Sequence, residues 1–191
     1  MNKVLRKAKM EKDVMVKYSR LGKIDDLSII AYTDSSYRNA EDRTKSVGGK
    51  FIALCNKEGK CGPLIWKSKT IQQVCKSIKN AETRSLERGL EDAIYLARML
   101  KEIYTGKMGD QHIPVEAKTD SKTLYDTLKS TKQVEEKSIR HLVAWIKQQM
   151  EEKAIQKVTW VPNKEMVADV FTKAGVRTDL ILSVISGGKL H

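Results

Sequence analysis

The amino-acid sequence predicts an α/β fold built on one mixed, five-stranded sheet with flanking helices. Three runs rich in β-branched and aromatic residues come first, and two more then alternate with stretches of helical periodicity. Consecutive strands joined by hairpin-type links form an antiparallel part of a sheet, whereas strands that alternate with helices form a parallel part with right-handed crossovers. We therefore expect strands 1–3 to be antiparallel neighbours and strands 1, 4 and 5 to be parallel.

The first three predicted strands cover residues 28–33, 46–55 and 63–68. The first ends at Asp34-Ser35-Ser36, which is a turn signal, and Asn56-Lys57-Glu58-Gly59 is typical of a hairpin between the second and the third. A long helix is predicted over residues 81–104, because apolar residues recur there at helical spacing, and Asn80 is its expected N-cap.

The second half of the chain continues with two more strands and further helices. The expected order is a strand over residues 115–119, helices over 121–129 and 134–153, a strand over 157–161 and a helix over 164–174. The predicted α/β domain covers residues 25–175. Residues 176–191 are expected to form a last helix or a tail.

The charge of the chain favours a polyanionic partner. The 191 residues carry 36 Lys and Arg against 24 Asp and Glu, a formal net charge of +12. Residues 1–24 hold eight of the bases and only two of the acids, so half of the excess lies in this segment, which we interpret as a basic lead-in or tether. A solvated basic tail is the alternative interpretation.

Several classes of protein are excluded or disfavoured by composition. With 40% hydrophobic residues and only 3 Pro and 11 Gly, the chain can form a core, which argues against a disordered protein. No apolar run approaches the roughly 18 residues that a membrane span needs, and no secretory signal is evident. Cys55, Cys61 and Cys75 form no metal-binding pattern, so we expect three unpaired cysteines in a reduced intracellular protein.

Four acidic residues fall where the predicted topology concentrates functional groups. Asp34 and Asp120 each follow a strand, Glu82 begins the long helix, and Asp169 lies in the last predicted helix. If strands 1 and 4 are adjacent and parallel, their carboxyl ends bring Asp34 and Asp120 side by side. Taken singly, each residue could instead be a turn, capping or solvent-facing residue.

Such a cluster of carboxylates predicts a divalent metal site. Gathered carboxylates repel one another unless a cation neutralises them, and oxygen-only ligands favour Mg²⁺ or Mn²⁺ over zinc. Two such ions about 4 Å apart are the usual device for hydrolysing a phosphodiester bond in line. The predicted chemistry and the positive net charge therefore indicate a nucleic-acid substrate.

The stretch from Ser28 to about Gly175 resembles the ribonuclease H domain of copia-type LTR retrotransposon polyproteins. The resemblance depends on six blocks in the same order, which are YTDSSY, DRTKSVGG, LIWKSK, NAETRSLERGLEDAIYLARML, TDSKTLYDTL and VTWVPNKEMVADVFTKAG. It implies a ribonuclease H-like fold and cleavage of the RNA strand of RNA–DNA hybrids with two Mg²⁺ ions, for which Mn²⁺ can substitute.

The resemblance also assigns roles to residues. Its four metal ligands fall on Asp34, Glu82, Asp120 and Asp169. Asp34 and Asp120 would bind the metals most directly, Glu82 would contact the scissile region and its water, and Asp169 would hold the metal that activates the water. Candidate contacts to the hybrid backbone are Asn39, Lys67, Lys69, Asn80 and Lys122, although the lysines are equally compatible with a solvated surface.

The resemblance further implies partners and a location. The domain would be joined to the reverse transcriptase polymerase domain of a parent polyprotein, and it would act in the cytoplasm, within a retroelement particle, or in the nucleus. No histidine lies shortly before Asp169, as one does in cellular ribonucleases H, so we expect weak activity from the isolated domain. The alternatives are a domesticated hybrid-binding module without catalysis and a DNA-strand nuclease or integrase of the same superfold.

Overall fold

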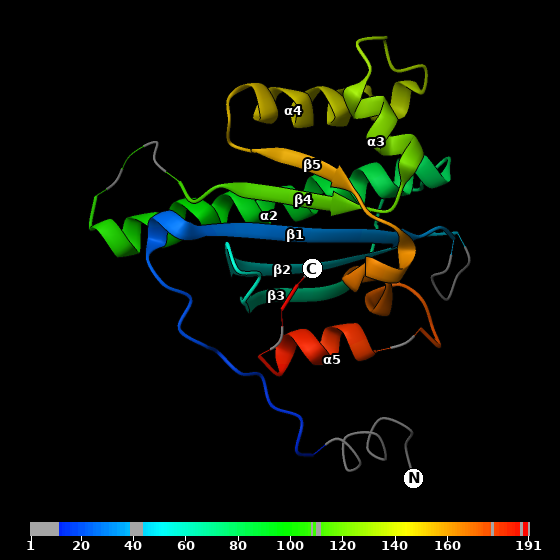
Figure 1. The fold of residues 1–191 in the computed structure, drawn as a ribbon. Helices are drawn as coiled ribbons and strands as arrows, with labels where there is room; N and C mark the ends of the chain where they lie inside the picture. The colour runs from blue at the N-terminus through cyan, green and yellow to red at the C-terminus, as the bar shows by residue number, and fades with distance from the viewer. Residues whose placement is uncertain are drawn as a thin grey trace.

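The structure contains one five-stranded mixed sheet, as expected. It is a computed structural model that describes residues 12–38, 44–107, 109, 112–176, 178–187 and 189–190. The strands lie in the order β3-β2-β1-β4-β5 (Figure 1). Their bounds are β1 Leu27–Ser36, β2 Val47–Asn56, β3 Cys61–Thr70, β4 Val115–Thr119 and β5 Lys157–Trp160. β1, β2 and β3 are antiparallel neighbours, whereas β4 is parallel to both β1 and β5.

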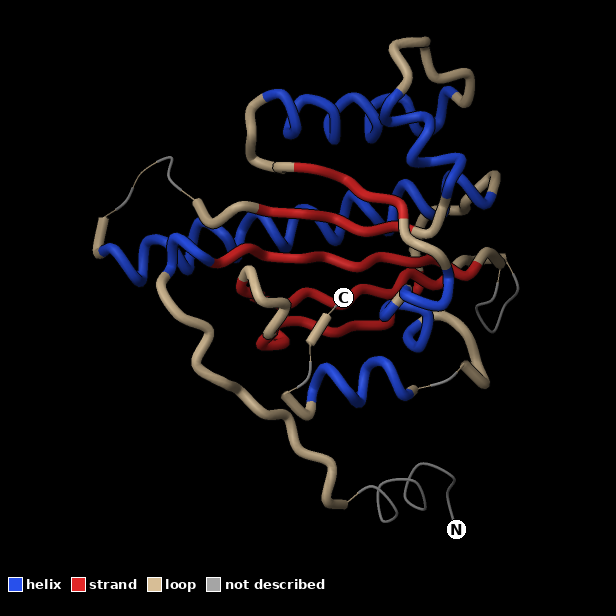
Figure 2. The backbone as a smooth tube through the Cα atoms, in the orientation of Figure 1, coloured by secondary structure: helices blue, strands red, loops and turns tan. Residues whose placement is uncertain are grey.

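Helices cover both faces of the sheet (Figure 2). The larger apolar core lies between the sheet and three helices, α2 Ile78–Thr105, α3 Lys122–Lys129 and α4 Arg140–Glu151. The second core lies on the opposite face, beneath the short 3-10 helix η4 Val167–Phe171 and helix α5 Asp179–Ile185. Side chains of β1 alternate between the two cores, with Ile29 and Ala31 in the first and Tyr32 in the second. Three further 3-10 helices are described, η1 Ile24–Asp26, η2 Lys137–Ile139 and η3 Asn163–Glu165.

Helix α2 crosses the sheet close to β1, and a glycine makes this approach possible. A Cβ added to Gly89 would lie 2.3 Å from Cγ2 of Thr33 on β1, so a larger residue would push the helix away. The helix also buries Leu86 and Leu90 completely, and each such burial contributes about 2 kcal/mol. The close approach of Gly89 to Thr33 holds the N-terminal half of α2 against β1.

The structure corrects several sequence-based boundaries. Ser77, rather than Asn80, caps α2: its side chain accepts the Asn80 backbone N–H at 2.9 Å, and the helix therefore begins earlier than expected. Asp34 lies inside β1 rather than after it, because β2 pairs with β1 as far as Ser36. The helix predicted over residues 134–153 is α-helical only in α4, after an irregular stretch and η2.

The last predicted helix is also different. In place of an α-helix over residues 164–174, the chain forms the two 3-10 helices η3 and η4, and Met166 between them has an extended backbone conformation. Apolar positions in this segment still face a core, with Val167 and Ala168 completely buried. Periodicity alone does not distinguish 3-10 turns from an α-helix over so short a stretch.

The described part of the N-terminal segment lies along the α/β domain. The Lys17 N–H donates to the Ile185 carbonyl oxygen of α5 at 2.7 Å, and the Tyr18 hydroxyl donates to the Pro63 carbonyl oxygen at 2.9 Å. Nδ2 of Asn56 donates to the Leu21 carbonyl oxygen at 3.1 Å. The division of the chain at residues 24 and 175 stays a prediction.

The expectation of three unpaired cysteines is wrong for two of them. Cys55 and Cys61 pair directly across β2 and β3, with their Cα atoms 4.2 Å apart, and form a disulfide. Their separation of six residues did not indicate a pair, because it is the hairpin register that places them opposite each other. Cys75 is free and buried, as expected. Among the described residues, no helix has both the length and the apolar character needed to cross a membrane.

Candidate active site

Three of the four predicted carboxylates meet at one end of the sheet. The parallel register pairs Tyr32 with Lys118, and two residues further along, Asp34 of β1 comes beside Asp120, which directly follows β4. Glu82 reaches the same place from the second turn of α2. One carboxylate oxygen from each of the three residues lies within 4.8 Å of the other two. Asp34 and Glu82 are buried, with 1% and 5% of their surface exposed.

Asp169, the fourth carboxylate, is linked to this group through a lysine. Asp169 lies in η4 on the opposite face of the sheet from α2, and it is also buried. Nζ of Lys173 is 2.7 Å from Oδ1 of Asp169 and 3.5 Å from Oδ1 of Asp34. The ammonium group of Lys173 therefore bridges the fourth carboxylate to the other three.

Hydrogen bonds fix the carboxylates in place. Oε1 of Glu82 accepts from the Ser35 hydroxyl at 2.8 Å and from the Ser35 N–H at 3.3 Å. Oδ2 of Asp34 accepts from the Thr172 hydroxyl. The indole N–H of Trp160, at the end of β5, donates to the Asp120 carbonyl oxygen at 2.9 Å, which holds the backbone at the end of β4.

The electrostatics of the site indicate that it lacks positive charge. Burial raises the pKa of Glu82 to about 8, and the negative charges of Asp34 and Asp120 add to this effect. Burial also raises the pKa of Asp34 to about 6, although the Thr172 hydrogen bond and Lys173 act in the opposite direction. The pKa of Asp120 is raised as well, mainly by burial. The ammonium of Lys173 thus offsets only part of the cost of ionising these carboxylates together.

The residues fit a divalent metal ion. Oε2 of Glu82 is buried and has no hydrogen-bond partner among the described residues, which is costly unless a cation or a water satisfies it. The three clustered groups offer only carboxylate oxygens, and such ligands suit Mg²⁺ and Mn²⁺. The unpaired oxygen and the raised pKa values mean that the described side chains do not neutralise these carboxylates, which a bound cation would do.

In EDTA, the melting temperature Tm is expected to fall as the pH rises from about 5 to about 8. Unfolded carboxyl groups ionise near pH 4, whereas Asp34 and Glu82 ionise near 6 and 8 in the folded chain. Over this range the folded state binds more protons than the unfolded state, so a rise in pH lowers the free energy of unfolding. Differential scanning fluorimetry across this range would measure the effect.

Glu82→Gln should flatten that pH dependence, because the amide cannot ionise. Glu91→Gln, a change on the exposed side of the same helix, is the matched control and should retain the wild-type slope. A saturating divalent metal should also flatten the wild-type curve, since it stabilises the ionised carboxylates. Equal slopes for Glu82→Gln and Glu91→Gln would show that Glu82 does not titrate in this range.

Of the predicted substrate-binding residues that the structure describes, Asn80 is buried and the three lysines are exposed. Asn39 lies outside the described residues. Asn80 is 1% exposed, and its amide group donates to Glu136 at 3.1 Å and to Ser138 at 2.7 Å. Its amide oxygen accepts from Nε of Arg84 at 2.9 Å, so the side chain is fully engaged within the protein. Asn80 thus ties the loop before α4 to the start of α2.

The three predicted lysines are all exposed. Lys67 and Lys69 project from the edge strand β3. Lys122 begins α3 next to the Asp120 backbone and forms an ion pair with Asp126 at 2.9 Å. Its ammonium group also lies 5.9 Å from the centre of the Trp160 ring, which is 41% exposed.

Sequence reasoning missed the three residues that contact the carboxylates, Ser35, Thr172 and Lys173, and Trp160, which holds the Asp120 backbone. A signal for Lys173 was available, because it follows Asp169 by four residues and a cation at that spacing can reach a carboxylate on a helical turn. Ser35 and Thr172 carried no comparable signal, since their hydroxyl groups reach residues 47 and 138 positions away in the chain.

The mixed sheet with strand order β3-β2-β1-β4-β5 and helices on both faces is a ribonuclease H-like fold, and solved structures agree on this fold. LC11-RNase H1, isolated from compost by a metagenomic approach, is similar with a TM-score of 0.54 and 21% identity over 76% of this chain and 92% of that one. RNase H1 from the archaeon Halobacterium salinarum is similar with a TM-score of 0.53 and 17% sequence identity, over 76% of this chain and 94% of that one.

LC11-RNase H1 in complex with an RNA/DNA hybrid gives a TM-score of 0.51 and 21% identity, over 75% of this chain and 93% of that one. No protein-family model and no curated protein sequence matches the chain. The structural neighbours are thus ribonuclease H domains that share the fold at low sequence identity.

Proposed function

We propose that this chain is a metal-dependent ribonuclease H that hydrolyses the RNA strand of RNA–DNA hybrids. The observation that carries the proposal is the group formed by Asp34, Glu82 and Asp120, whose carboxylate oxygens lie within 4.8 Å of one another on a ribonuclease H-like sheet. The net charge of +12 supports a polyanionic substrate. The complex of the structural neighbour LC11-RNase H1 with an RNA/DNA hybrid supports this class of substrate.

Asp34, Glu82, Asp120 and Asp169 would hold two Mg²⁺ or Mn²⁺ ions. When bound, these ions supply activation of the attacking water and stabilisation of the leaving oxygen. Asp34 and Asp120 would bind the ions most directly, since Asp34 lies near the end of β1 and Asp120 directly follows the adjacent parallel strand β4. Glu82, which keeps one oxygen without a partner among the described residues, would share in holding the metal and would contact the scissile region and its water.

Selection of a hybrid would depend on shape and on ribose hydroxyl groups rather than on bases. Trp160 and Lys122 are suited to this role, since both are exposed beside Asp120. The strand that carries the 2′-hydroxyl groups would lie across the carboxylates, and the positive residues around them would hold its phosphates.

We also propose that the domain comes from a copia-type retroelement, where it would work with the reverse transcriptase polymerase domain. The six sequence blocks, and above all VTWVPNKEMVADVFTKAG, support this origin. The proposed location is the cytoplasm, within a retroelement particle, or the nucleus. A reducing cytoplasm would convert Cys55 and Cys61 to thiols, and strand pairing would still hold β2 against β3.

Cleavage of a labelled RNA–DNA hybrid, and of neither duplex DNA nor duplex RNA, is the expected result in Mg²⁺ or Mn²⁺. EDTA should abolish it, and Asp120→Asn should show no cleavage under the same conditions. Cleavage of duplex DNA instead would identify a DNA-strand nuclease. Tight hybrid binding without cleavage in either metal would identify a non-catalytic binding module, and in both cases the proposed activity would be wrong.

A further inference from the structure

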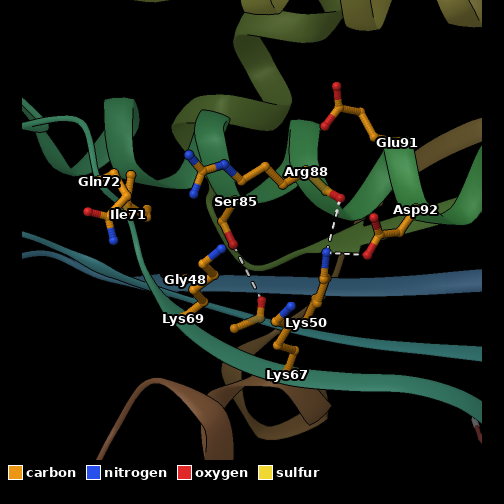
Figure 3. Close-up of a pocket in the computed structure, with 11 residues that line it drawn as sticks. Gly48, Lys50, Lys67, Lys69, Ile71, Gln72, Ser85, Arg88, Glu91 and Asp92 are labelled. Carbon is orange, nitrogen blue, oxygen red and sulfur yellow. Dashed lines mark hydrogen bonds and ion pairs between the residues drawn. The ribbon is translucent and has the colours of Figure 1, made fainter.

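A basic pocket lies between α2 and the strands β2 and β3 (Figure 3). It has a volume of about 400 Å³ and is open to solvent. Its floor is formed by β2 and β3, and α2 forms its wall. The charged side chains that line it are four bases and two acids: Lys50, Lys67, Lys69, Arg88, Glu91 and Asp92.

The sheet register explains why the bases converge. Lys50 of β2 pairs with Lys67 of β3, and Gly48 pairs with Lys69, so these residues share one face. At Gly48 the strand lies close to its neighbours: a Cβ there would approach the Ser85 Oγ to 3.3 Å and Ile71 to 3.5 Å. The pocket therefore gathers basic side chains from two adjacent strands on one face of the sheet.

Three of the four bases form no ion pair in the part of the chain that the structure describes. Lys50 is ion-paired with Asp92, as Figure 3 shows, and its Nζ also donates to the Arg88 carbonyl oxygen at 3.3 Å. The guanidinium group of Arg88 donates to the neutral amide oxygen of Gln73 at 2.8 Å. Lys67 and Lys69 are exposed, and neither has an ion-pair or hydrogen-bond partner among the described residues.

The pocket is adjacent to the candidate active site without sharing its carboxylates. Ser85, in the pocket wall, lies three residues after Glu82, which is about one turn of α2. Its hydroxyl donates to the Asp34 carbonyl oxygen at 2.7 Å and lies 3.4 Å from the Gly49 carbonyl oxygen. Gly49 pairs with Asp34 across β1 and β2, a spacing of about 4.8 Å.

We infer that this pocket is a second anchoring site for the nucleic acid, in which Lys67, Lys69 and Arg88 bind backbone phosphates a short distance from the scissile bond. The inference rests on the proposed function, since the hybrid is the expected polyanion. Two lysines and an arginine that form no ion pair among the described residues make a site that attracts phosphate groups. Phosphates bound in this pocket would fix the position of the nucleic-acid strand that crosses the carboxylates. Arg88 is therefore a positioning residue for the cleavage reaction.

The variant that tests this inference is Lys67→Ala/Lys69→Ala/Arg88→Ala. Hybrid binding would be measured by fluorescence anisotropy in EDTA, where no cleavage occurs, over a range of salt concentrations. For each phosphate that the variant no longer binds, the dissociation constant at about 0.1 M salt should rise about tenfold, and the slope of log K against log salt should decrease by about 0.9. In metal, the KM for hybrid cleavage should rise while kcat changes by less than about twofold.

Lys57→Ala/Lys60→Ala/Arg98→Ala is the matched control. It removes the same charge from exposed residues outside the pocket, at the β2–β3 hairpin and on the later turns of α2. Its salt slope should stay close to that of the wild type. Equal reductions of affinity in the two triple variants would overturn the inference, because only the total charge would then matter.

Two further outcomes separate this inference from the proposed function. A wild type that binds and cleaves the hybrid, beside a pocket variant with unchanged affinity and slope, would overturn the pocket alone. A wild type that binds no hybrid would overturn both. If inorganic phosphate at constant ionic strength raises the Tm of the wild type but the pocket variant binds hybrid normally, the pocket takes free anions and the inference is wrong.

Discussion

Asp34→Asn is expected to lower the rate of hybrid cleavage by about a thousandfold. Asp34 belongs to the three-carboxylate group and also receives the Thr172 hydroxyl and the Lys173 ammonium, so it links all the elements of the site. A bound divalent ion contributes several kcal/mol of charge stabilisation in the transition state, and the loss of about 4 kcal/mol corresponds to this factor. Single-turnover cleavage of a labelled hybrid in Mg²⁺ would measure it.

Misfolding would not account for such a decrease in rate. Replacing one of several buried carboxylates with an amide relieves their mutual repulsion, so the Tm of Asp34→Asn in EDTA at pH 8 should equal or exceed that of the wild type. Asp25→Asn, a change of the same kind at an exposed position before β1, should leave the cleavage rate within about twofold. A variant of Asp34 that retains more than a tenth of the wild-type rate would show that this residue does not hold a catalytic metal.

Lys173→Met is expected to tighten divalent metal binding by about tenfold and to destabilise the metal-free protein. The ammonium group of Lys173 contacts Asp169 and Asp34 at the place where a metal ion would be bound, so it repels that ion. Unit charges 4 Å apart interact by about 4 kcal/mol near a protein surface. The exposure of the Lys173 side chain, 36%, reduces this through solvent screening, which leaves an effect of about tenfold.

Isothermal titration of Mn²⁺ into the protein would measure the affinity, and thermal melting in EDTA would measure stability. The Tm of Lys173→Met in EDTA should fall by a few degrees, since about 1 kcal/mol corresponds to roughly 2–4 °C in a chain of this size. Lys173→Arg, which keeps the charge, should behave like the wild type in both measurements. Unchanged metal affinity in Lys173→Met would mean that the ammonium does not compete with the ion.

The mixed sheet could be predicted because its signals are local. Runs of β-branched residues and hairpin-type turns indicate strands, and helical spacing of leucines and alanines indicates α2. The errors arose where tertiary contacts decided the outcome. β1 extends through Asp34 because β2 pairs with it there, and the predicted last helix is replaced by η3 and η4, where Val167 and Ala168 pack in the second core.

The candidate site shows the same division. Asp34 and Asp120 were predictable as neighbours, because each stands at the carboxyl end of a strand and adjacent parallel strands share an edge. The burial of Asn80 and its hydrogen bonds within the protein were not predictable, because its amide donates to Glu136 and Ser138, which lie 56 and 58 residues away along the chain. The partners of Cys55 and Lys173 were likewise decided by strand register and by the packing of η4 on the sheet.

By itself, the sequence determined the class of fold, the choice of four acidic residues as candidate metal ligands and the basic character of the molecule. These depend on residue type and on spacing along the chain, which sequence periodicity records. Only the tertiary structure decided that Lys173 bridges Asp34 and Asp169, that one oxygen of Glu82 is left without a partner among the described residues, and that Lys67, Lys69 and Arg88 surround one pocket. The physical reason is that each of these features joins distant segments, and electrostatic energy depends on distance in space rather than along the chain.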